Sequence, residues 1–176
     1  MNGAVAILSL LALAGAVLPA AAATPQPARP VAQALYSGRW YEIARTPNHT
    51  EGACQASTYD FSGWSGGRFS AGLTCHSGGP AGPVRTMTLS GHVLPQTQNT
   101  KIQLALLGGL ITQQYWILDH AADDAWLIMT TPNARYVWLM SRNPALAGAA
   151  RAAALARLQQ FGFDLSRLVF PAQAVR

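Results

Sequence analysis

The stretch YSGRWYEIARTPN, residues 36–48, places Gly38, Trp40 and Tyr41 in the order Gly-x-Trp-Tyr at the start of a predicted β-strand. Tryptophan is large and mostly apolar, and its indole N–H needs a partner when it is buried. Taken by itself, Trp40 is therefore expected to be an aromatic side chain of the core. What it packs against depends on what the rest of the chain builds around it.

Short strands separated by turn signals continue from this stretch to residue 142. The breaks between them are rich in Gly, Pro, Asn and Asp, which favour turns. We predict eight strands, at 39–46, 53–61, 68–75, 84–94, 100–107, 112–119, 125–131 and 135–142. Links of hairpin length predict an up-and-down antiparallel sheet, and such a sheet loses its two exposed edges when it closes into a barrel. The predicted fold class is all-β.

The pattern changes after the last strand. Residues 143–162, NPALAGAARAAALARLQQFG, are rich in alanine and predict one helix. Asn143 is the expected N-cap, Pro144 the first helical residue and Gly162 the residue just past the end. We expect this helix to pack outside the barrel, because its charges are too few for the alternative, a membrane-surface helix. FDLSRLVF, residues 163–170, predicts a return segment with a last short strand.

The first 23 residues carry no charged side chain and end in small residues at Ala-x-Ala spacing. This pattern predicts a signal peptide with cleavage near Ala22 or Ala23, although the usual basic residue near its start is missing. A membrane anchor is the alternative, which the short apolar run and Pro19 disfavour. Residues 24–34 are expected to be a proline-rich, poorly ordered lead-in, and residues 35–176 the single folded domain.

The chain has a formal net charge of +5, and eleven of its twelve basic residues are arginines. They are scattered singly, without a cluster or a basic helix face. The pattern therefore favours a solvated surface over a nucleic-acid-binding protein.

Two cysteines, Cys54 and Cys75, flank the turn signal GWSGG at residues 63–67. If this turn joins two antiparallel strands, the cysteines lie opposite or nearly opposite each other. We predict a disulfide, which suits an exported chain and contributes roughly 3 kcal/mol in the chain-entropy model. A catalytic or metal-binding role is disfavoured, because there is no Cys-x-x-Cys and a lone pair has too few ligands for zinc.

Three segments resemble, in the expected order and spacing, the motifs of the lipocalin family. They are GRWYEIAR at 38–45, YWILDHAADDAWLIM at 115–129 and YVWLMSRNP at 136–144. FGFDLSRLVF at 161–170 is similar to the bacterial outer-membrane and apolipoprotein D-like branch of that family. The resemblance implies an eight-stranded barrel with one helix packed outside it.

The resemblance also gives Trp40 a role. In lipocalins this tryptophan closes one end of the barrel, and the arginine of the last strand, here Arg142, packs across its ring. Gly38 would give the chain room to turn into the first strand. Many bacterial relatives have a lipid-modified cysteine after the signal, where LAGA at residues 13–16 has alanine. We therefore expect a periplasmic or secreted protein without a lipid anchor.

Strand alternation predicts which side chains face the cavity of such a barrel. The expected ligand-binding set is Met87, Leu89, Ile102, Leu104, Tyr115, Ile117, Trp126, Ile128, Tyr136, Trp138 and Met140. This apolar and aromatic lining predicts a carrier that transports or stores a fatty acid, a lysophospholipid or a similar small hydrophobic ligand, with a role in envelope lipid maintenance. The head group would stay near the mouth, where Arg45, His49 and Arg135 are candidates to contact it. The alternative for each of the three is an ordinary surface residue without a role in binding.

Other interpretations remain open. The interior could be filled by its own side chains, or it could hold an isoprenoid or a tetrapyrrole; His92 is the one strand histidine to consider for haem, and it is expected to point outward. No catalytic motif is present, so we expect no enzyme, cofactor or metal site. An interaction protein would need exposed apolar loops, and only LLGGLI at 106–111 qualifies. The expected partners are a small hydrophobic ligand and, transiently, a membrane; the oligomeric state is left open.

Overall fold

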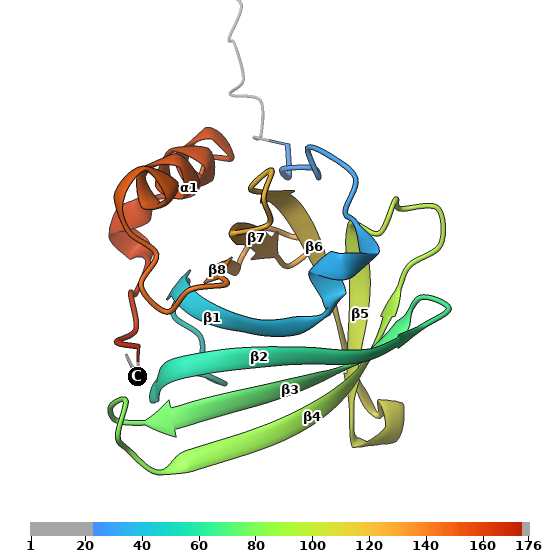
Figure 1. Cartoon of the computed structure of the whole chain (residues 1–176), viewed down its shortest axis with the longest axis horizontal. Coiled ribbons are helices and arrows are strands. Elements are labelled where there is room, and N and C mark those ends of the chain that lie inside the picture. The colour runs from blue at the N-terminus through green and yellow to red at the C-terminus, as the bar shows by residue number, and fades with distance from the viewer. Residues whose placement is uncertain (1–22, 174–176) are drawn as a thin grey trace, which may run out of the picture.

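The computed structural model describes residues 23–173, and in this part of the chain eight antiparallel strands form a closed barrel (Figure 1). Each strand pairs with the next, and the last pairs with the first. The predicted fold class is confirmed. The predicted signal peptide and the LAGA segment lie outside the described residues, apart from Ala23.

All eight predicted strands are present. Their bounds are β1 Gly38–Arg45, β2 Cys54–Ser65, β3 Arg68–Ser77, β4 Val84–Val93, β5 Lys101–Leu106, β6 Ile111–His120, β7 Trp126–Thr130 and β8 Val137–Ser141. Short 3₁₀ turns occur at η1 Gln33–Tyr36, η2 Leu107–Gly109 and η3 Leu165–Arg167. Strand β2 runs farther than predicted, because the hairpin turns only at Gly66 and Gly67, both with positive φ. Two consecutive residues with positive φ suit the tight turns that join twisted strands.

The one α-helix among residues 23–173, α1 Gly148–Gln160, packs on the outside of the barrel (Figure 1). Its Ala154 and Leu158 are fully buried. The predicted start of the helix is wrong: Asn143 is not the N-cap and Pro144 is not the first helical residue, because α1 begins at Gly148 after the N-cap Ala147. The side-chain oxygen of Asn143 instead accepts a hydrogen bond from the Ala145 N–H at 2.9 Å, which closes a turn before the chain reaches the helix.

The predicted end of α1 is confirmed. Gly162 has a φ of +87° and follows the C-cap residue. Its N–H donates to the Gln159 carbonyl at 2.9 Å, and the Phe163 N–H donates to the Leu158 carbonyl at 3.1 Å. These two bonds are the Schellman pattern that satisfies the last carbonyls of a helix.

Trp40 closes one end of the barrel, as the resemblance implied. The side chain is fully buried, and its indole N–H donates to the Leu35 carbonyl at 3.1 Å. The Arg142 guanidinium lies 3.7 Å from the centre of the indole ring. Arg142 also donates to the Ser37 carbonyl at 2.7 Å, so it joins the last strand to the segment before β1. Gly38 has a φ of +68° at this crossing, a conformation that favours glycine.

The lead-in crosses the closed end of the barrel and is not poorly ordered there. The Ala28 N–H donates to the Leu118 carbonyl at 2.7 Å, and Arg29 forms an ion pair with Asp119 at 2.7 Å. Asp119 is buried and also accepts from Arg157 of α1 at 2.5 Å. One carboxylate thus joins the lead-in, β6 and the outer helix.

The predicted disulfide between Cys54 and Cys75 is present, with the two Cα atoms 5.2 Å apart. A bulge in β2 between Gln55 and Thr58 shifts the register at this point. The predicted return segment is also present. Val169 pairs with Arg45 in an isolated antiparallel bridge beside β1.

Apolar side chains form two clusters, one inside the barrel and one between the barrel and α1. Strand β7 contributes to both, and every one of its residues is buried. The prediction that Trp126 and Ile128 face inward is wrong: both belong to the outer cluster. Leu127 and Met129 face inward, opposite Met140 and Trp138 of β8. Alternation cannot distinguish the two faces of a strand whose residues are apolar on both. The predicted assignment for β7 was therefore off by one residue, which exchanges the two faces.

Candidate functional site

The closed half of the barrel is filled by its own side chains. Tyr36, Trp64 and Phe69 stack on one another, and Phe61 meets Phe69 edge to face. Phe69 lies directly over Gly91 of β4, where a Cβ atom would come within 2.3 Å of the ring. This plug leaves no usable space above Trp40 beyond a void of about 10 Å³.

The open half contains a cavity of about 540 Å³, within the range of small-molecule sites. Of the predicted ligand-binding residues, six line it: Met87, Leu89, Leu104, Tyr115, Tyr136 and Trp138. Ile102, Ile117 and Met140 face the barrel interior but lie outside this cavity, with Ile117 and Met140 beside the small void. Contact of any of these residues with a ligand remains a prediction.

Sequence reasoning missed much of the wall. The additional lining residues are Asn48, Thr50, Glu51, Tyr59, Leu73, Leu106, Ile111, Thr112, Gln113, Met129 and Thr131. Leu73 is an inward-facing position of β3 that a complete alternation count would have found, whereas the uniformly apolar β7 gives alternation no basis for placing Met129 inward. The others come from β2, β5 and β6 and from the loops at the mouth, whose conformation the strand pattern does not specify.

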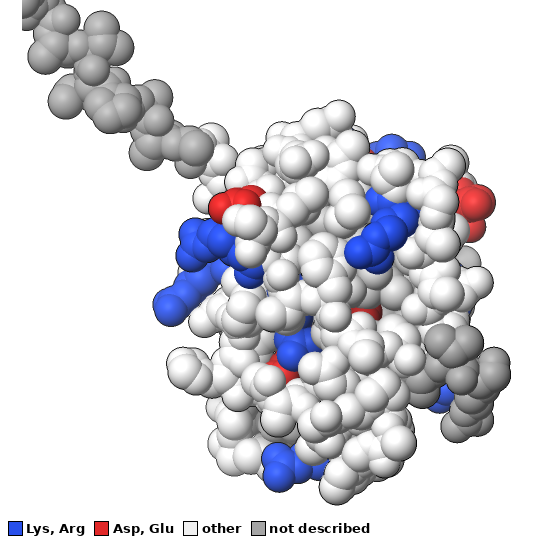
Figure 2. Space-filling model, turned by 90° about the vertical axis from the view of Figure 1, so that its left-hand side faces the viewer, with Lys and Arg blue, Asp and Glu red and all other residues white. Residues whose placement is uncertain are grey.

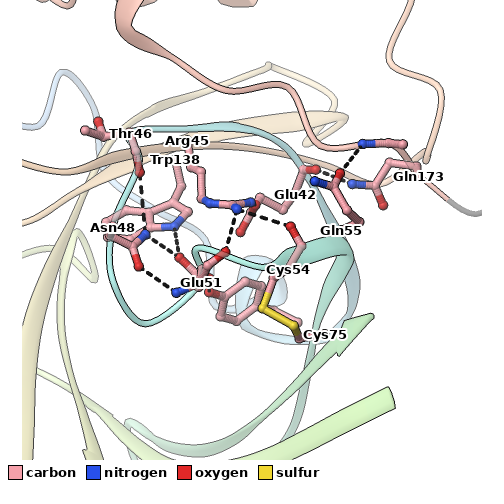
Figure 3. Close-up of polar contacts among 12 residues, drawn as sticks. Glu42, Arg45, Thr46, Asn48, Glu51, Cys54, Gln55, Cys75, Trp138 and Gln173 are labelled. Carbon is pink, nitrogen blue, oxygen red and sulfur yellow. Dashed lines mark hydrogen bonds and ion pairs between the residues drawn. A yellow bond between two sulfur atoms is a disulfide. The ribbon is translucent and has the colours of Figure 1, made fainter. Parts of the chain in front are cut away.

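A buried carboxylate lies in the cavity wall, on the loop that joins β1 to β2. Glu51 is 4 % exposed and accepts three side-chain hydrogen bonds (Figure 3). Tyr59 donates to one oxygen at 2.7 Å, and Asn48 and Trp138 donate to the other at 2.7 and 3.0 Å. Because all four residues line the cavity, its otherwise apolar wall has one polar, hydrogen-bonded side.

Behind Glu51, Arg45 and Glu42 form a buried ion pair (Figure 3). Arg45 also donates to the carbonyls of Glu51 and Cys54, at 2.6 and 3.1 Å. Arg45 thereby holds the first loop against the barrel. It was predicted as a head-group candidate at the mouth, and this is wrong, because its side chain is buried in the protein wall and pairs there with Glu42.

Burial and the neighbouring Glu51 carboxyl raise the pKa of Glu42 to about 8, although Arg45 opposes the shift. Burial also raises the pKa of Tyr115 to about 12, with a further contribution from Glu51. The pKa of Tyr59 is raised well above its usual value for the same two reasons. The cavity wall is therefore a place where additional negative charge is unfavourable.

Of the remaining head-group and haem candidates, only His49 lines the cavity. His49 is exposed and lines the mouth, whereas Arg135 is exposed and lies against the Tyr136 ring without lining the cavity. His92 does not line the cavity. No group of three or more His, Cys, Asp or Glu side chains in residues 23–173 is arranged to hold a metal ion.

A single-domain barrel with one closed end, one open end and an apolar cavity defines a class of small-molecule-binding folds. Residues 32–173 match the model of the lipocalin-like domain family, so the chain belongs to that family. Comparison with curated proteins finds no match. The described part of the chain contains no helix long and apolar enough to span a membrane.

Solved structures share the fold at low sequence identity. Insecticyanin from the tobacco hornworm Manduca sexta has a TM-score of 0.70 at 16% identity, over 88% of this chain and 86% of its own. The cockroach allergen Per a 4 has a TM-score of 0.66 at 16% identity, over 88% and 94%. Lobster apocrustacyanin A1 has a TM-score of 0.65 at 16% identity, over 81% and 80%. At this identity the likeness concerns the fold alone.

Proposed function

We propose that this lipocalin is a non-enzymatic carrier that holds one long-chain lipid, a fatty acid or a lysophospholipid, in its open-half cavity. The observation that carries the proposal is the cavity of about 540 Å³ that is closed at one end and opens through the loops. Leu73, Met87, Leu89 and Leu104 from β3, β4 and β5 give it one continuous apolar wall.

The apolar wall suits an acyl chain. Each buried methylene group contributes about 0.8 kcal/mol, so a chain of about ten methylene groups gains roughly 8 kcal/mol before the costs of ordering it. The Glu51 carboxylate faces the same space, and a free carboxylate placed beside it would be repelled. The head group is therefore expected at the mouth, near His49 and Thr50, with the tail pointing towards the aromatic plug.

The proposal includes export to the periplasm or the outside of the cell, in line with the leader pattern of residues 1–23. The Cys54–Cys75 disulfide supports it, since such bonds persist in oxidising compartments. Assignment to the bacterial outer-membrane and apolipoprotein D-like branch, and a role in maintaining envelope lipids, belong to the same proposal. Fractionation of the producing cells tests the location: protein retained in the cytoplasm would contradict it.

Two tryptophans make a matched pair for testing ligand binding. Trp138 lines the cavity and donates to Glu51, whereas Trp126 lies in the outer cluster under α1. Titration with a fatty acid or lysophospholipid should change the intrinsic fluorescence saturably, near one-to-one stoichiometry. Trp138→Phe should remove most of that change, and Trp126→Phe should leave it in place.

Three outcomes would move the assignment. A flat titration with every acyl ligand, together with tight binding of haem or a bilin, would indicate a tetrapyrrole carrier. Turnover of a lipid by protein purified to homogeneity would indicate an enzyme. A signal that depends on Trp126 and not on Trp138 would place the ligand outside the barrel.

A further inference from the structure

The open end of the barrel carries exposed apolar side chains that folding does not require. Three of them, Leu107, Leu110 and Ile111, lie where β5 joins β6. We call these three residues the E–F tip, because β5 and β6 are the fifth (E) and sixth (F) strands of the barrel. Their exposed fractions are 64%, 86% and 56%. Val84, on the adjacent edge at the start of β4, is another exposed apolar residue. Of the six large apolar side chains exposed among residues 23–173, four therefore lie in the tip and on the adjacent edge of β4, whereas Val169 and Phe170 lie beside β1, across the barrel.

The conformation of the tip directs these side chains outward. Leu107 has a φ of +51°, which is unfavourable for any residue with a Cβ atom, and Gly108 and Gly109 also have positive φ. A glycine at position 107 would adopt this turn without strain. The chain instead keeps a large apolar side chain in a strained position and in contact with solvent.

The charges around the tip have one sign. The four open-end loops follow β1, β3, β5 and β7, so the tip lies between the loop before β4 and the loop before β8. Arg85 on one side and Arg135 on the other are both exposed. The open-end loops at 46–53, 78–83, 107–110 and 131–136 carry a single acidic residue, Glu51, and it is buried in the wall.

The exposed acidic residues lie elsewhere. Asp123 and the half-buried Asp124 are in the loop between β6 and β7 at the closed end, the half-buried Asp60 pairs with Arg39, and the exposed Asp164 caps the 3₁₀ turn η3 after α1. Figure 2, which shows the face that carries α1 and the C-terminal segment, has basic side chains that are scattered and not gathered into a patch. The arrangement of arginines around an apolar tip thus distinguishes the open end from that face.

We propose that the open end docks on an anionic lipid bilayer, with the E–F tip inserted among the acyl chains and Arg85 and Arg135 beside the phosphates. Apolar side chains flanked by cations are the combination that interfacial binding requires. Leu106 and Ile111 also line the cavity, so the apolar wall continues from the tip into the interior. Docking in this way faces the mouth towards the membrane.

This inference goes beyond ligand binding and does not need an occupied cavity. Vesicle flotation of the full chain measures membrane binding directly. The two samples are phosphatidylcholine vesicles and vesicles in which part of this lipid is replaced by phosphatidylglycerol. All variants carry the same N-terminus, so the residues before the barrel contribute equally. We expect binding to the anionic vesicles to exceed binding to the neutral ones and to weaken with salt.

Leu107→Gly combined with Leu110→Ser should weaken binding to anionic vesicles at least about tenfold, because two inserted side chains are lost. Leu107→Gly relieves the strained turn, so a folding defect cannot account for the loss. Arg85→Gln and Arg135→Gln should each weaken binding about fivefold on anionic vesicles only. The matched controls are Phe170→Ser, an exposed apolar residue beside β1 and across the barrel from the tip, and Arg68→Gln at the closed-end hairpin; both should bind as the unaltered protein does.

A site-specific readout completes the test. In Leu110→Trp, the new indole should be quenched by lipids that carry bromine on their acyl chains. Equal binding by the tip variants and the unaltered protein, or an unquenched indole at position 110, would overturn the proposal. So would loss of a dimer in the tip variants without a change in vesicle binding, since the tip would then be a contact between two copies of this chain.

Discussion

The two ends of this barrel are built on opposite principles. At the closed end, apolar and aromatic side chains fill the space, and Trp40, Arg142 and Asp119 join segments that are far apart in the sequence. At the open end, the interior stays hollow, its wall holds the buried Glu42–Arg45–Glu51 cluster, and leucines are exposed. The comparison indicates that one end stabilises the fold and the other is free to vary with the ligand.

The largest effect should follow from emptying the closed end. Trp40→Ala should lower the free energy of unfolding by about 3–5 kcal/mol, the cost of removing a buried large aromatic side chain. Arg142→Ala should also destabilise the protein. Because Arg142 lies 3.7 Å from the indole centre, the two losses should be coupled in a double-mutant cycle measured by urea unfolding. Losses that simply add would show that the stack contributes nothing of its own.

The disulfide is the strongest constraint at the open end. Replacing Cys54 and Cys75 together by serine should cost roughly 3 kcal/mol in the chain-entropy model. Urea unfolding of oxidised protein and the double variant measures the difference. Thiol titration of unreduced, denatured protein provides the check, and two reactive thiols per chain would contradict the bond.

A smaller loss should follow from removing one hydrogen bond inside the polar wall. Tyr59→Phe leaves one Glu51 oxygen without its donor at 2.7 Å, at a cost of about 1.5–3 kcal/mol for a bond to a charged group. The matched change Tyr36→Phe removes the hydroxyl that donates to the Asn99 carbonyl at the closed end. If Glu51 fixes the mouth loop, only Tyr59→Phe should also increase proteolytic cleavage within 46–53.

The last effect is a dependence of stability on pH. The pKa of Glu42 rises from its ordinary 4.5 to about 8 on folding, so the folded state holds its proton more tightly than the unfolded state. The resulting stability is complete below about pH 4.5 and is lost as the pH rises through 8, with a slope of at most about 1.4 kcal/mol per pH unit. Glu42→Gln should remove this slope from unfolding measured at several pH values. Identical slopes for the variant and the unaltered protein would contradict it.

How far the sequence predicts this molecule differs between the same two ends. One short motif contains both Gly38 and Trp40, a second contains Arg142, and local turn signals mark the eight strands, so the fold and the Trp40–Arg142 contact at the closed end were predictable. Trp126 and Ile128 were misplaced because β7 is buried on both faces and apolar throughout. The apolar sequence of β7 fits either assignment of its inward and outward faces, and only the pairing with β8 decides between the two.

The polar wall was not predictable for a different reason. An acidic residue in a loop such as TPNHTEG normally lies in solvent, and nothing local indicates that Glu51 is buried. Its position depends on Tyr59 and Trp138, which lie on separate strands and meet only once the barrel has closed. The misassignment of Arg45 has the same origin, because its partners include carbonyls of the loop that it holds.

The docked lead-in has a practical consequence for handling the protein. Because Ala28 and Arg29 are fixed against β6 at the closed end, anything attached before them leaves the barrel at the pole opposite the mouth (Figure 1). The C-terminal segment, in contrast, runs beside Arg45 and the start of β2 at the open end. A biosensor surface that captures the chain by its N-terminus should therefore present the mouth to the solution, whereas capture by the C-terminus should bring the mouth close to the chip.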